Sequence, residues 1–124
     1  MTLDRPPAKS LEDLVVWRKA HAFVLEVYRL TACFPKQEMY GLSSQMRRVA
    51  TSNAPNIAEG FRKRGKADKA RFMNPAEGSA EDSHDYLILA RDLGYAETES
   101  LVKLLDEVSR LLNCYARAIM ASNF

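Results

Sequence analysis

The sequence predicts an all-α fold, an antiparallel up-down-up-down four-helix bundle, and three observations support this prediction. Apolar residues recur every three or four positions in four long segments. Glycine and proline residues stand at the boundaries between these segments. No segment of the sequence alternates apolar and polar residues for long enough to form a β-strand. Because the links are short, consecutive helices are expected to run in opposite directions.

The first segment has one apolar stripe and ends at a proline. Pro35 cannot continue a helix, so the helix is expected to stop just after Phe34. The second helix is expected to begin after Gly41, with the hydroxyl of Ser43 or Ser44 as its cap. The residues of the first stripe are Val16, Ala20, Phe23, Val27, Leu30 and Phe34.

The second segment contains an internal proline and ends near a run of cations. Pro55 removes one backbone donor, which predicts a kink near residues 51–52, and Gly65 suits the end of the helix. Asn56 and Glu59 are placed to hydrogen-bond the backbone groups that Pro55 frees, and Glu59 is also a candidate to pair with Arg47, Arg48 or a basic residue of a neighbouring subunit. The apolar stripe consists of Leu42, Met46, Val49, Asn53, Ile57 and Phe61.

The third and fourth segments complete the bundle. A helix is expected over residues 66–93, with small residues in its first half that let a neighbouring backbone come close, and Gly94 ends it. Pro75 predicts a bend in this helix or a later start. The fourth helix is expected to start near Thr98, with a stripe of Leu101, Leu104, Leu105, Val108, Leu111, Leu112, Tyr115 and Ile119.

Length and composition predict one globular domain. The 124 residues, 47% hydrophobic and 27% charged, favour a single bundle over residues 11–120, with a flexible arm at 1–10 and a frayed tail at 121–124. The apolar runs are too short for a membrane span, and the first residues lack the apolar core of a signal peptide. Cys33 and Cys114 stand alone, which predicts reduced, mostly buried thiols in a cytoplasmic protein.

Charge is unevenly distributed along the chain. Residues 47–71 carry eight Lys or Arg against two acidic residues, whereas residues 72–124 carry four basic residues against nine acidic ones. Such polarity suits a polyanionic partner, self-association of opposite patches, or a solvated turn between two helices. The candidate phosphate-binding residues are Arg47, Arg48, Arg62, Lys63, Arg64, Lys66, Lys69 and Arg71.

The sequence gives little support to catalysis or metal binding. Glu81 and His84 form one Glu-x-x-His motif, but a di-iron bundle needs two, and His21 has Arg18 where the second glutamate would stand. Neither cysteine has a base nearby in the sequence, and no strand precedes the glycines as a phosphate-cradling loop requires. We therefore expect no catalytic residue, no metal site and no cofactor.

Five ordered blocks carry a resemblance to a known family: LEDLVVWRKAH (Leu11–His21), FPKQEMYGLSSQMRR (Phe34–Arg48), NIAEG (Asn56–Gly60), AEGSAED (Ala76–Asp82) and LILARDLGY (Leu87–Tyr95). These blocks resemble the four-helix bundle proteins of the 23S rRNA intervening-sequence family, also labelled S23 ribosomal proteins. The resemblance extends from about Leu11 to Tyr115. Pro75 and the segment 51–56, whose proline stands about one position late, depart from the family pattern.

The resemblance implies a ring-like homopentamer with a basic surface for RNA or DNA, and it implies no catalytic residues. A distant kinship with the pentameric accessory protein of diversity-generating retroelements points the same way, and an unidentified protein partner stays open. The runner-up interpretation is a protein-assembly module without a nucleic-acid role. The family motifs fall on residues expected to be structural: Trp17, Tyr40, Gly41, Asn56, Glu59, Gly60, Gly78, Ser79, Gly94 and Tyr95.

Overall fold

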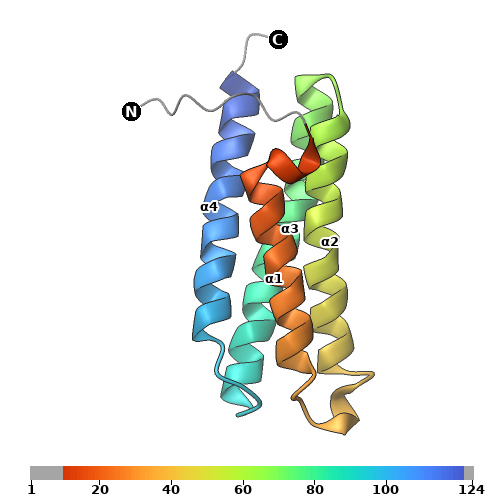
Figure 1. Cartoon of the computed structure of the whole chain (residues 1–124), viewed down its shortest axis with the longest axis vertical. Coiled ribbons are helices and arrows are strands. Elements are labelled where there is room, and N and C mark those ends of the chain that lie inside the picture. Colours follow the sequence, from red (N-terminus) through yellow and green to blue (C-terminus); the bar gives the residue numbers. More distant parts are fainter. Residues whose placement is uncertain (1–9, 122–124) are drawn as a thin grey trace.

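Four helices stand side by side in the computed structural model, which describes residues 10–121. Figure 1 shows that each helix runs opposite to the one before it, and the packed pairs are α1–α2, α2–α3, α3–α4 and α4–α1. The all-α four-helix bundle is therefore confirmed. The elements are η1 (Leu11–Asp13), α1 (Val15–Thr31), η2 (Lys36–Glu38), α2 (Leu42–Arg62), α3 (Lys66–Asp92) and α4 (Glu99–Ala121).

The expected terminal arm and tail fall mainly on residues 1–9 and 122–124, which lie outside the described residues. Ser10 and Ala121 are described. The backbone N–H of Ser10 donates to the Asp13 carboxylate at 3.2 Å, and Ala121 is the last residue of α4. The domain boundaries stay a prediction.

The interior forms two apolar clusters that follow one another along the bundle. One cluster lies around Phe23, Val27 and Leu87. The other lies around Ile57 and Met73 and extends to the last turns of α4, where Leu112 and Ile119 are buried. Each of these large side chains stabilises the fold by about 1.5–3 kcal/mol through burial. The second cluster supports the end of the bundle at which α2 turns into α3.

The ends of α1 and α2 differ from the sequence prediction. Helix α1 ends at Thr31, three residues early, and two turns carry the chain to Phe34, which is buried nevertheless. The predicted serine caps are wrong, because Ser43 and Ser44 lie inside α2. Gly41 is the N-terminal cap position, and the backbone N–H of Leu42, at the start of the helix, donates instead to the Glu38 carboxylate at 3.1 Å.

Gly94 and Tyr95 lie in the loop between α3 and α4, which contacts the loop between α1 and α2 at one end of the bundle. Gly94 has a φ of 74°, a left-handed conformation that favours glycine, and the N–H groups of Gly94 and Tyr95 donate to Arg91 and Ala90 as in a Schellman motif. The Tyr95 ring packs on Phe34, and its hydroxyl donates to Glu38 at 2.7 Å. These contacts join the loop between α3 and α4 to the loop between α1 and α2.

Both internal prolines are accommodated within continuous helices. Helix α2 runs through Pro55, and the Asn56 side-chain amide donates to the Ser52 carbonyl at 2.7 Å, next to the carbonyl that Pro55 deprives of its donor. Helix α3 starts at Lys66 despite Pro75, so the predicted later start is wrong. Gly65 precedes α3 as its N-terminal cap position, three residues beyond the end of α2.

Small polar side chains join α2 to α3. The Ser79 hydroxyl contacts the Ser52 hydroxyl and the Val49 carbonyl, and the Asn53 amide donates to the Ala76 carbonyl at 2.6 Å. Small residues on α3 therefore do let the neighbouring backbone come close at this seam.

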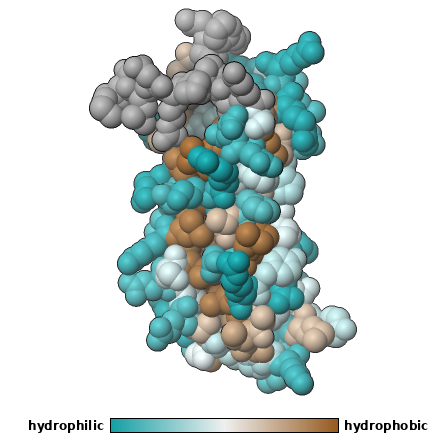
Figure 2. All heavy atoms as spheres, viewed as in Figure 1, coloured by the Kyte–Doolittle hydropathy of each residue, from teal (hydrophilic) through white to brown (hydrophobic). Residues whose placement is uncertain are grey.

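Several aromatic and apolar side chains face outward. Trp17 is half-buried and stacks on His21, with 4.9 Å between ring centroids, while Tyr40 is 91% exposed. Figure 2 shows hydrophobic residues along the middle of the face that carries α4, α1 and α2, interrupted by hydrophilic ones. The cysteine prediction is wrong in part, since Cys33 and Cys114 are free thiols but both are exposed. Among the described helices, none is long and apolar enough to cross a membrane.

Candidate nucleic-acid interface

A short connection brings six cations to one end of the bundle. Only residues 63–65 separate α2 from α3, so the last turn of α2 lies against the first turns of α3. Gly60 permits this close approach, because a Cβ atom there would lie 2.6 Å from Met73 Cε and 3.3 Å from the Lys69 carbonyl oxygen. We call this end of the molecule the basic turn, comprising Arg62, Lys63, Arg64, Lys66, Lys69 and Arg71.

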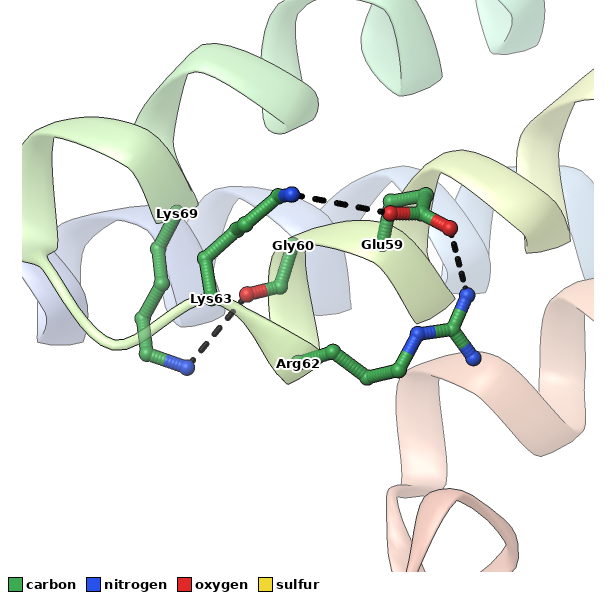
Figure 3. Close-up of polar contacts among 5 residues, drawn as sticks. All are labelled: Glu59, Gly60, Arg62, Lys63 and Lys69. Atoms are coloured by element: carbon green, nitrogen blue, oxygen red, sulfur yellow. Dashed lines mark hydrogen bonds and ion pairs between the residues drawn. The ribbon is translucent and has the colours of Figure 1, made fainter.

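Glu59 neutralises part of the basic turn. Figure 3 shows Arg62 and Lys63 reaching the Glu59 carboxylate, at N–O distances of 2.6 and 3.8 Å. The hydrogen bond from Arg62 and its charge hold the pKa of Glu59 below its usual value, with a smaller contribution from Lys63. Both ion pairs are solvent-exposed and therefore weak, so the two cations can exchange this carboxylate for a phosphate.

Two lysines hold helix ends together. Lys69 Nζ donates to the carbonyl oxygens of Gly60 and Phe61 at 3.3 and 2.9 Å, and Figure 3 shows its side chain folded back over the end of α2. Lys66 Nζ lies 3.4 Å from the Met120 carbonyl oxygen at the end of α4. Each ammonium lies where the helix dipole is negative, an arrangement that stabilises the bundle.

Arg64 and Arg71 are exposed, and neither guanidinium group has a hydrogen bond or ion pair within residues 10–121. The Arg71 guanidinium lies 5.7 Å from the centroid of the Phe72 ring, and Lys63 Nζ lies 5.3 Å from the same ring. Cations and an aromatic ring therefore alternate on the surface of the turn.

Arg47 and Arg48 belong to a different part of the molecule. Arg47 Nε donates to the Thr31 hydroxyl at 2.8 Å, and its guanidinium lies 4.8 Å from the centroid of the Tyr28 ring on α1. Arg48 donates to the side chain of Gln45. Arg47 and Arg48 precede Arg62 by fifteen and fourteen residues of helix, which places them about 22 Å from it along α2. The eight sequence candidates thus divide into a group of six and a separate pair.

A cleft of about 320 Å³ opens beside the basic turn, between that turn and the last turns of α4. The helical pattern of the sequence assigned Phe61 and Tyr115 to the interior, and their part in this cleft was missed. The one sequence signal for the cleft was the position of Phe61 directly before a run of cations. Burial raises the pKa of Tyr115, which keeps its phenol protonated. The lining residues are Phe61, Arg64, Lys66, Lys69, Tyr115, Ala118 and Ile119.

The described part of the chain contains no group of three or more His, Cys, Asp or Glu residues arranged to hold a metal ion. His84, the residue of the Glu-x-x-His motif, is exposed on α3.

Comparison with known proteins places this bundle in a family. The model of the 23S rRNA-intervening sequence protein family matches residues 12–115. The chain belongs to that family. A crystal structure of a protein with unknown function from the S23 ribosomal protein family of Bacteroides thetaiotaomicron is similar, with a TM-score of 0.76 and 25% sequence identity. The alignment covers 83% of this chain and 96% of that one. Among curated proteins, none matches.

The family match confirms the resemblance seen in the sequence blocks. The family description names no catalytic activity, and the similar crystal structure is described as a protein with unknown function.

Proposed function

We propose that this chain is a non-enzymatic, self-associating accessory or scaffold protein of the cytoplasm, whose basic turn binds the phosphate backbone of RNA or DNA without sequence specificity. The observation that carries the proposal is the concentration of cations at the turn, with Arg64 and Arg71 exposed. Lysine and arginine displace condensed counterions from nucleic acid, a contribution that is independent of base sequence.

The charge balance of the turn supports binding rather than mere solubility. Arg62 and Lys63 share one carboxylate, so together with Arg64 and Arg71 they leave about three positive charges for phosphate contacts. The remaining two, Lys66 and Lys69, are engaged with backbone carbonyls, and Asp68 in the first turn of α3 offsets one of their charges. Repetition of such a patch in a homopentamer, as the family resemblance implies, would convert weak contacts into useful avidity.

Fluorescence anisotropy with labelled structured RNA and duplex DNA tests the proposal. A test variant replaces Arg62, Arg64 and Arg71 with Ser, which removes three charges from the turn. A matched control replaces Arg29, Arg91 and Arg110 with Ser; these exposed residues lie away from the turn, and the net charge falls by the same amount.

The proposal expects micromolar or tighter binding at low salt that is lost in the test variant and kept in the control. Equal losses in both variants would show that net charge, rather than the turn, is responsible. An absence of binding by folded wild-type protein at low salt would refute the proposal.

A protein-assembly role without nucleic acid is the second candidate, and exposed apolar side chains favour it. Tyr40 is 91% exposed and Met39 58% exposed on the loop between α1 and α2, where neither stabilises the monomer by burial. Size-exclusion chromatography with light scattering, performed on Tyr40→Ser and the wild type, tests this role. The other exposed large apolar residues are Leu25, Tyr28, Leu89, Leu93 and Met120.

A further inference from the structure

The cleft beside the basic turn is lined by both apolar and cationic side chains. Phe61 comes from the end of α2, and Tyr115 and Ile119 come from the last turns of α4. Ile119 is buried, whereas both aromatic residues are half-buried, so their rings contribute to the accessible wall. Aromatic rings partly open to solvent are the platforms on which unpaired nucleobases stack in proteins that bind single strands.

The charges around the cleft match a ligand that carries phosphates beside an apolar ring. Arg64, Lys66 and Lys69 line the cleft, and within the described residues no acidic side chain does. Arg64 is exposed and can move to meet a phosphate, while Lys69 is tied to the end of α2 and contributes a fixed positive charge. A nucleotide combines a flat, largely apolar base with charged phosphates, the same two kinds of group that the lining of this cleft suits.

The size of the cleft restricts the ligand further. Its volume of about 320 Å³ lies at the lower end of the range of small-molecule sites, about 300–1,000 Å³. One base with part of its sugar fits such a space. A paired base within a duplex has neighbours on both faces, so only an unpaired base can reach the rings.

We propose that this cleft accepts one unpaired nucleobase from a loop or end of RNA or DNA, stacked against Phe61 and Tyr115, while Arg64 and Lys66 hold the flanking phosphates. The inference rests on the proposed function and adds that the protein binds single strands more tightly than duplexes of equal length. The Tyr115 hydroxyl, which stays protonated at neutral pH, is available as a hydrogen-bond donor to the base edge.

The test compares four labelled 12-nucleotide probes at one salt concentration: single-stranded RNA, single-stranded DNA, duplex DNA, and a DNA strand whose central nucleotides are abasic. The variant Tyr115→Leu removes one ring and keeps apolar bulk, and Tyr115→Phe keeps the ring and removes the hydroxyl. A strand carrying 2-aminopurine reports stacking of the base directly, through a change in its fluorescence. Circular dichroism confirms that each variant is folded.

The proposal expects Tyr115→Leu to weaken binding of intact single strands by about tenfold, the loss of one stacked base, and to leave duplex and abasic binding unchanged. Tyr115→Phe should keep most of the affinity. Equal affinity for all four probes, unaffected by Tyr115→Leu, would overturn the cleft proposal and leave phosphate binding by the turn intact. No binding of any probe would overturn both.

Discussion

A single methyl group at Gly60 tests the packing that forms the basic turn. Gly60→Ala would place a Cβ atom 2.6 Å from Met73 Cε, and Met73 is 1% exposed within the core, so its side chain has little room to move. Overpacking of this kind costs about 2 kcal/mol. The higher helix propensity of alanine offsets about 1 kcal/mol of this destabilisation. We therefore expect a net destabilisation of about 1 kcal/mol.

Gly78→Ala is the matched control for this prediction. Gly78 lies within α3, and a Cβ atom there would meet no other atom within 4 Å, so the same substitution should stabilise by about 1 kcal/mol. The difference of about 2 kcal/mol corresponds to about 8 °C in Tm for a chain of this size. Thermal unfolding followed by circular dichroism measures it.

The double variant Gly60→Ala, Met73→Leu tests whether contact with Met73 causes the destabilisation by Gly60→Ala. Leucine lacks the Cε atom, so Gly60→Ala should cost less in that background by about 0.5 kcal/mol or more. If Gly60→Ala raised the Tm as much as Gly78→Ala does, the close approach of α2 and α3 at the turn would not be as described.

Three further predictions follow from individual contacts. The hydrogen bond from Tyr95 lowers the pKa of Glu38, so its contribution to the free energy of unfolding is complete above pH 4.5 and is lost as the pH falls through the lowered pKa. Urea unfolding at pH 7 and at pH 3 measures this contribution. The difference in unfolding free energy between the two pH values should be smaller in Tyr95→Phe than in the wild type. Leu112 is fully buried, and Leu112→Ala should lower the free energy of unfolding by about 2–5 kcal/mol in the same urea assay. A loss below about 1 kcal/mol would contradict its place in the core. Arg48→Ser should change the affinity for duplex DNA by no more than about twofold, because Arg48 lies far from the basic turn, whereas Arg64→Ser should weaken it several-fold. Equal effects of the two substitutions in fluorescence anisotropy would contradict the division between the basic turn and the pair Arg47 and Arg48.

Most of the fold was predictable because the helix signals are local. The stripe from Leu42 to Phe61 predicted α2, and the glycine at position 94 predicted the end of α3, each to within a residue or two. The cap of α2 was not predictable, since Glu38 replaces the expected serine and its orientation depends on Tyr95 from a distant loop. Local patterns do not show such long-range hydrogen bonds.

The candidate site was predictable in part. The run of cations in residues 62–71 gave the basic turn, but sequence alone could not show that Lys69 is held by backbone carbonyls. The cleft was missed because Tyr115 reaches the turn from α4, and the helical pattern shows only that it lies on the apolar stripe. The late start that Pro75 suggested for α3 was wrong, because α3 begins at Lys66 and continues through Pro75 with packing on its inner face.

The salt dependence of duplex binding tests the central claim most directly. If the turn makes about three phosphate contacts per engaged chain, log Kd should change with log salt with a slope of magnitude about 2.7, and affinity should fall about 40-fold between 50 and 200 mM salt. The variant with Arg62, Arg64 and Arg71 replaced by Ser should lose most of this slope, and the control lacking Arg29, Arg91 and Arg110 should keep it. A slope that is the same in all three proteins would contradict the claim that the basic turn is the nucleic-acid interface.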